Sequence, residues 1–89
     1  MISIAQIRAA RGLLKWTQAT LAHRAGLSTV ALNMIENEAV QPRESTISRI
    51  QAALEEGGGV FLAEDGIGGG VRFRRTRVAS KVRGAPRNA

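Results

Sequence analysis

The 89-residue sequence predicts a mainly α-helical fold in which four short helices are followed by a β-hairpin. Three observations support this prediction. Apolar side chains recur every three or four residues up to about residue 56, as on the buried face of an amphipathic helix. Glycines end two of these stretches, at Gly26 and at residues 57–59. Beyond them the apolar period changes to two, which is typical of strands.

The first helix is expected over about residues 3–14. Ser3, followed three residues later by Gln6, has the form of a capping box, in which each side chain bonds the other residue's backbone amide. Gly12 lies inside the helical pattern, where glycine costs about 1 kcal/mol relative to alanine, so it marks either a close contact or a weak point. Lys15 must then leave the helix without a glycine. The apolar positions of this helix are Ile4, Ile7 and Leu14.

Two further helices meet at Gly26. Thr17 is placed to cap the first and Ser28 the second, because a hydroxyl oxygen can accept a hydrogen bond from an unpaired amide at a helix start. Gly26 can adopt the positive φ needed to leave a helix sharply, and Leu27 can then turn back into the core. Two short helices joined by a glycine-containing turn are the helix-turn-helix unit of DNA-binding proteins. The apolar face of this pair comprises Leu21, Ala22, Leu32 and Ile35.

Trp16 precedes the Thr17 cap, and we interpret it as a packing residue that forms the hydrophobic staple, because a buried indole contributes a large apolar area. After Pro42 a fourth helix is expected over about residues 44–56, with Glu44 favourably placed near its positive end. Its apolar positions are Ile47, Ile50 and Leu54.

Two short strands are expected over about residues 60–63 and 71–74. An isolated hairpin is marginally stable in water, so a helix face or a partner chain must cover it. We therefore interpret the hairpin as a homodimerisation element. The residues expected to carry dimerisation are Val60, Phe61, Leu62, Val71 and Phe73.

The formal net charge of +6, with an isoelectric point near 11.6, indicates a polyanionic partner. Residues 1–57 carry a balance of only +1, whereas residues 58–89 carry +5. The helical region is therefore nearly neutral. The basic tail over residues 76–89, which we expect to be flexible, either keeps the protein soluble or adds phosphate contacts, and both interpretations stay open.

Several function classes lack support in the sequence. The chain has no cysteine and a single histidine, His23, so neither a disulfide nor a metal site is predicted. No apolar run is long enough to span a bilayer, and a cytoplasmic, nucleoid-associated protein without a membrane partner is expected. Ser28 and Ser45 have no histidine and aspartate to activate them, so no enzyme activity and no cofactor are predicted.

Two motifs stand out in the helical region: IRAARGLLKWTQATLAHRAGLSTVALNMIEN and, after it, P-x-x-x-T-I-x-R-I-x-x-A-L. On these motifs the sequence from residue 4 to residue 56 resembles the phage-repressor and Cro-like helix-turn-helix proteins, the XRE family. It implies a lambda-repressor-like four-helix domain over residues 1–57. The hairpin element over residues 58–75 then takes the place of the fifth helix of many relatives, and the tail follows.

The resemblance also implies roles for particular residues. Gln18 matches a glutamine that contacts the DNA backbone and braces the first base-contacting residue, and Arg43 matches a basic residue that lies against the backbone or the minor groove. Arg11 and Glu36 match a structural ion pair. Ser28 is expected to be a helix cap and a phosphate ligand. The residues expected to enter the major groove are Thr29, Val30, Asn33 and Met34.

Three departures from the family pattern bear on DNA recognition. The position after Asn37, commonly glycine, is Glu38, and residues 39–41 lack the usual basic side chains, so weaker phosphate contacts are expected. Val30 and Met34 are apolar where polar side chains are frequent. Recognition is therefore expected to use thymine methyl groups and DNA shape.

These observations favour a sequence-specific transcriptional regulator, interpreted as a repressor, that binds double-stranded DNA as a homodimer. An alternative is the antitoxin of a toxin–antitoxin pair, with a protein partner as well as its own promoter. The nearly neutral helical domain and the apolar strands are compatible with either function.

Overall fold

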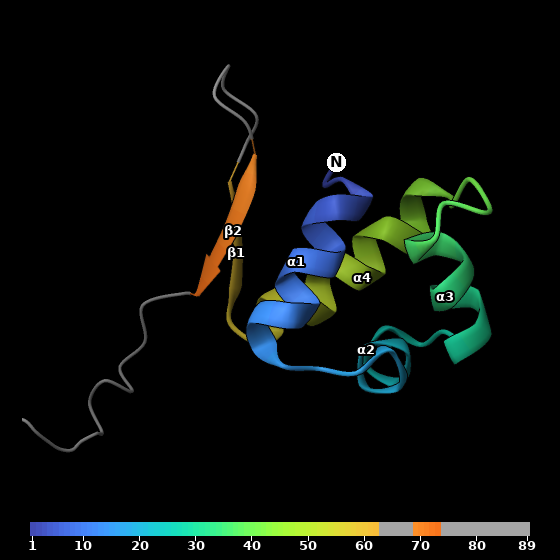
Figure 1. Cartoon of the computed structure of the whole chain (residues 1–89), viewed down its shortest axis with the longest axis horizontal. Coiled ribbons are helices and arrows are strands. Elements are labelled where there is room, and N and C mark those ends of the chain that lie inside the picture. The colour runs from blue at the N-terminus through green and yellow to red at the C-terminus, as the bar shows by residue number, and fades with distance from the viewer. Residues whose placement is uncertain (63–68, 74–89) are drawn as a thin grey trace, which may run out of the picture.

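The computed structural model describes residues 1–62 and 69–73 and has four helices and one antiparallel strand pair (Figure 1). The predicted class, mainly α with a C-terminal hairpin, is confirmed. The hairpin and the third helix lie on opposite sides of the first and fourth helices. The elements are α1 (Ile4–Leu14), α2 (Gln18–Ala25), α3 (Thr29–Glu36), α4 (Glu44–Glu56), β1 (Gly59–Leu62) and β2 (Gly70–Phe73).

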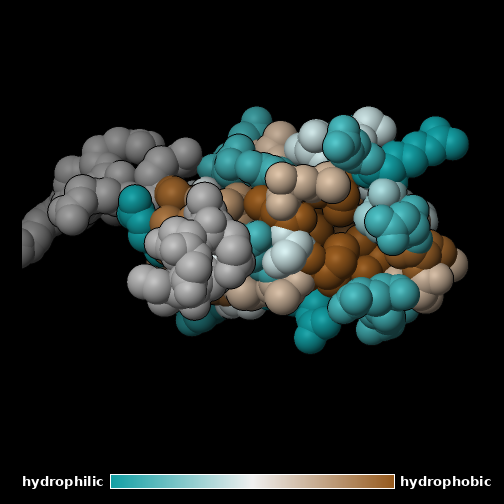
Figure 2. All heavy atoms as spheres, turned by 90° about the horizontal axis from the view of Figure 1, so that it is seen from above, coloured by the Kyte–Doolittle hydropathy of each residue, from teal (hydrophilic) through white to brown (hydrophobic). Residues whose placement is uncertain are grey.

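All four helices contribute their apolar faces to one core. Because apolar residues spaced three and four apart share a helix face, each helix turns one stripe inward. On the face shown in Figure 2, hydrophobic side chains also gather at the surface over the helical part, between hydrophilic margins. The largest fully buried side chains are Ile7, Leu21, Leu32, Ile50 and Leu54.

Three of the helices begin at a side-chain cap. The Ser3 hydroxyl accepts from the Gln6 amide at 3.0 Å while the Gln6 side chain accepts from the Ser3 amide at 2.9 Å, so the predicted capping box is formed. The Thr17 and Ser28 hydroxyls cap α2 and α3 in the predicted way. These contacts are local, which is why the sequence alone located the helix starts.

The first three helices are each followed by a left-handed residue, and only one of these residues is glycine. Gly26 follows α2 with φ +75°, whereas Lys15 and Glu38 adopt φ +59° after α1 and α3. In each case the next amide bonds a carbonyl five residues back, as Ala39 does to Met34 at 2.9 Å. A side chain in this conformation costs roughly 1–2 kcal/mol, so two of the turns carry strain.

Trp16 is half-buried against the core, which agrees with a packing role. Its ring lies so close to Gly57 that a Cβ there would be 2.5 Å from the indole. The Arg24 guanidinium lies over the same ring, 4.5 Å from its centroid. Gly12, by contrast, has no atom within 4 Å of the place that a Cβ would take, so of its two interpretations only the weak point remains.

The strands begin one residue earlier than predicted, at Gly59 and Gly70, because an alternating pattern of side chains cannot detect glycine. Phe61 pairs with Val71, and both side chains pack against the core, so the chain's own helices cover this face. By alternation, Val60, Leu62 and Arg72 lie on the outer face. The predicted strand ends at residues 63 and 74, like the predicted tail, lie outside the described residues.

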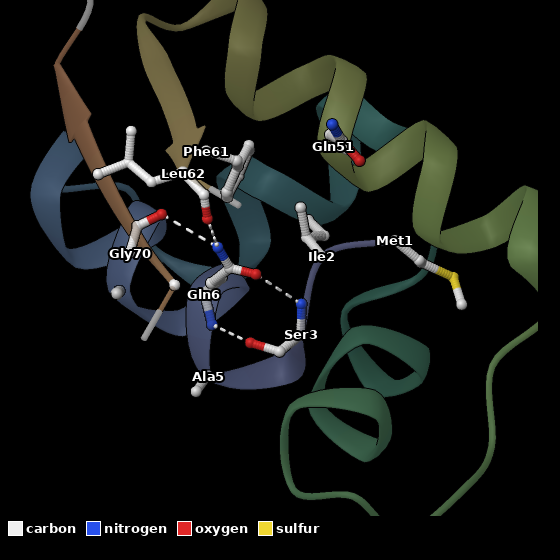
Figure 3. Close-up of a pocket in the computed structure, with 11 residues that line it drawn as sticks. Met1, Ile2, Ser3, Ala5, Gln6, Gln51, Phe61, Leu62 and Gly70 are labelled. Carbon is white, nitrogen blue, oxygen red and sulfur yellow. Dashed lines mark hydrogen bonds between the residues drawn. The ribbon is translucent and has the colours of Figure 1, made fainter. Parts of the chain in front are cut away.

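A single side chain of α1 holds the hairpin end. Gln6 Nε2 donates to the carbonyl oxygens of Leu62 and Gly70, at 3.0 Å each, and so bridges the two strands (Figure 3). Its Oε1 stays in the capping box, so the carboxamide serves both contacts. Among residues 1–62 and 69–73, none of the helices has the length and apolar character needed to cross a membrane.

Candidate nucleic-acid interface

Helix α3 has one buried and one exposed side. Its buried side comprises Leu32, Ile35 and Glu36, all at most 5% exposed. The base-contacting residues expected from the sequence all lie on the opposite, exposed side, where Val30 is 69% and Met34 40% exposed. Such an arrangement presents a contiguous helix surface of mixed polar and apolar character. The exposed residues of this surface are Thr29, Val30, Asn33 and Met34.

Glu36 is anchored by a side chain of α1. Arg11 Nε donates to Glu36 Oε2 and Arg11 Nη2 to Oε1, both at 2.9 Å, which is the bidentate geometry that suits a guanidinium. The Glu36 side chain is 3% exposed and that of Arg11 25%, so the carboxylate is nearly desolvated while the guanidinium still reaches solvent. Arg11 also donates to the Trp16 carbonyl, and Arg8 to the Glu36 carbonyl. The pair therefore fixes the end of α3 on α1.

The hydrogen bonding continues outward from this ion pair to the exposed side of α3. Gln18 Nε2 donates to Glu36 Oε1 at 3.1 Å, and Gln18 Oε1 accepts from Asn33 Nδ2 at 3.2 Å. Asn33 Oδ1 in turn accepts from Asn37 Nδ2 at 3.2 Å. We name this series the side-chain relay; its members are Arg11, Glu36, Gln18, Asn33 and Asn37.

The relay refines the role that the resemblance implies for Gln18. Its carboxamide contacts Asn33, which lies one turn further along α3 than Thr29, the first position expected from the sequence to contact a base. Sequence reasoning missed Arg8 and Asn37 as members of this site. The spacing of four residues between Asn33 and Asn37 was the available signal, because residues four apart are neighbours on a helix surface.

The two remaining expected DNA contacts lie at helix starts. The Ser28 hydroxyl is exposed and accepts from the Ala31 amide at 3.0 Å, and this bond leaves its own O–H able to donate to a phosphate oxygen. Arg43 precedes α4 as its N-terminal cap residue and makes no side-chain capping bond. Its guanidinium is exposed, as a phosphate ligand must be.

Four helices around one core, with an exposed third helix that follows a short turn, define a helix-turn-helix DNA-binding domain. The helix-turn-helix family HTH_3 matches residues 7–58, more than half of the chain. The chain therefore belongs to this family of XRE-type helix-turn-helix proteins and is a DNA-binding transcriptional regulator. No curated protein matches it.

Proposed function

We propose that the chain is a homodimeric repressor that binds an inverted-repeat operator, with α3 of each subunit in the major groove of one half-site. The observation that carries this proposal is the exposed α3 surface, held rigidly on the core by Leu32, Ile35 and the Arg11–Glu36 pair. Two half-sites then lie one helical turn apart, about 34 Å.

Dimerisation is proposed because the helical domain carries little charge of its own. Residues 1–57 have a balance of +1, so one copy gains little from phosphate attraction. Joining two copies makes the second contact intramolecular and raises affinity without new contacts. The outer face of the hairpin supplies a surface for this, because Leu62 on it is 42% exposed. Phe73, which lies at the end of β2 on the opposite face, is 55% exposed.

Selection of bound sequences from random duplexes, followed by footprinting, tests the DNA-binding part. An inverted repeat with one-turn spacing is expected. Thr29→Ala and Asn33→Ala are each expected to cost about 1–3 kcal/mol at the selected operator while circular dichroism stays unchanged. Binding without any sequence preference would count against a specific regulator.

Sedimentation at micromolar concentration tests the dimer. Leu62→Asp is expected to shift the mass from dimer to monomer, because a carboxylate would be desolvated in the interface. Val40→Asp is the matched control, since Val40 is 40% exposed but belongs to the loop between α3 and α4 and not to the hairpin. A wild-type monomer that persists at this concentration would exclude the hairpin dimer.

The exposed Leu62 and Phe73 side chains also support a second candidate, an antitoxin whose hairpin binds a protein partner. This function predicts that a small toxin encoded beside the gene co-purifies with the wild-type chain. Leu62→Asp would then abolish co-purification while the DNA-binding surface on α3 stays intact.

A further inference from the structure

We propose that Asn33 selects adenine at one position of each half-site, with its carboxamide orientation set by the side-chain relay. This inference rests on the proposed placement of α3 in the major groove. The contacts among the five relay side chains fix which atom donates and which accepts in each hydrogen bond. These directions determine which base Asn33 can pair with.

The Glu36 carboxylate sets the direction of the hydrogen bonds in the relay. The Glu36 carboxylate, held by two bonds from Arg11, can only accept hydrogen bonds. The group 3.1 Å from its Oε1 must therefore be the donor end of Gln18, which is Nε2. The reverse orientation would place two acceptor oxygens in contact beside a nearly buried charge.

This orientation is transmitted to the exposed side of α3. With Nε2 directed at Glu36, Gln18 presents Oε1 outward, and this oxygen requires a donor. Asn33 supplies Nδ2 at 3.2 Å, which leaves its Oδ1 to accept from Asn37 Nδ2 at 3.2 Å. Both ends of the Asn33 carboxamide are therefore held before any DNA is bound.

Asn33 retains the two groups that adenine requires. A carboxamide has two N–H donors and two acceptor lone pairs, and the relay uses one of each. One N–H and one lone pair remain on an exposed residue. In the major groove adenine offers the N7 acceptor beside the N6 donor, whereas guanine offers two acceptors. A fixed asparagine carboxamide therefore matches adenine and leaves one group unpaired opposite guanine.

Selection from random duplexes, with affinities then measured for single-base variants of the selected site, tests the proposal. The wild type is expected to prefer adenine at one position per half-site on the order of tenfold over guanine. Asn33→Ala should remove this preference at that position alone. Asn33→Asp, which keeps the size but loses the donor, should also lose it. Thr29→Ala, on the same helix but outside the relay, is the comparison for base choice: it should lower affinity for the site but keep the adenine-to-guanine ratio at the Asn33 position.

Gln18→Met tests the relay itself, because methionine has a similar length and makes no such hydrogen bonds. If Gln18 only contacted the DNA backbone, its loss would lower the affinity for all DNA sequences equally. Release of the Asn33 carboxamide should instead lower the adenine-to-guanine ratio several-fold at the Asn33 position. Thermal unfolding of each variant checks that the domain is folded.

Different results would overturn the proposed function, the assignment of Asn33 and the role of the relay. A wild-type protein with no base preference would overturn the proposed sequence-specific function. A wild-type preference that Asn33→Ala leaves intact, or lowers uniformly at every position, would overturn the assignment of Asn33. A preferred base other than adenine would do the same. A full adenine-to-guanine ratio in Gln18→Met would show that the relay does not set the orientation.

Discussion

Helix α1 holds two different regions of the molecule by two different kinds of contact. Near its C-terminal end, Arg11 holds α3 through a nearly buried ion pair with Glu36. Near its N-terminal end, Gln6 holds the hairpin through neutral hydrogen bonds to two backbone carbonyls. The two regions lie on opposite sides of the helical core (Figure 1).

The two kinds of contact differ in how much free energy is lost when they break. A buried charge that loses its partner has no favourable alternative, so α3 has one stable position on the core. A carbonyl near the surface that loses its donor can bond to water. We therefore expect the DNA-binding helix to be rigidly placed and the hairpin to open locally at lower cost, as suits a surface that meets a partner.

The largest effect is expected at the ion pair. Arg11→Ala should lower the free energy of unfolding by about 3–5 kcal/mol, because it leaves Glu36 buried without a partner. Urea denaturation measures this loss. Arg8→Ala is the control, since Arg8 is exposed and donates a longer bond, of 3.4 Å, to the Glu36 carbonyl. Equal losses in the two variants would show that the buried ion pair contributes no more to stability than the exposed Arg8 contact.

A smaller and more local effect is expected at the hairpin. Gln6→Glu keeps the acceptor of the capping box but replaces the donor to Leu62 and Gly70, and should cost about 1–2 kcal/mol. Amide hydrogen exchange should accelerate in β1 and β2 while α2 and α3 keep their protection. Ala5→Glu controls for the added charge, because Ala5 is exposed on the same first turn of α1 and its substitution removes no hydrogen bond. Uniform acceleration in all elements would refute local opening.

A gain in stability is expected where α3 ends. Glu38→Gly should raise the free energy of unfolding by about 1 kcal/mol, because glycine adopts φ +59° without a Cβ clash. Glu38→Gln removes the same charge but keeps the strained backbone. Thermal melting should therefore separate the two variants, and equal stability would mean that charge, not conformation, governs this position.

The smallest effect is expected at Gly12. Gly12→Ala should stabilise α1 by about 0.5 kcal/mol, because the new methyl group meets nothing within 4 Å and Gly12 lies in the last turn, where the full cost of about 1 kcal/mol in a helix interior is not reached. The same substitution at Gly57 should destabilise, since its methyl group would lie 2.5 Å from the Trp16 ring. Denaturant unfolding of both variants measures the sign of each change in the free energy of unfolding. A gain in stability for Gly57→Ala would contradict the close contact between Gly57 and the Trp16 ring.

Much of the fold was predictable because its signals are local. The caps at Ser3, Thr17 and Ser28 act on amides three residues away, so their effect can be inferred from the sequence. The strand starts at Gly59 and Gly70 were missed by one residue because glycine carries no side chain to show alternation. The exposed surface of α3 followed from helical periodicity combined with the family resemblance.

The sequence by itself therefore determined the helices, their caps, the turn at Gly26 and the charge of each region, because these depend on neighbours within about one helical turn. Only the tertiary structure decided which side chains share hydrogen bonds. It brought Gln6 to carbonyls 56 and 64 residues away and aligned Gln18 between Glu36 and Asn33. A carboxamide has several donors and acceptors, and its sequence context does not say which partners will meet them once the chain has packed.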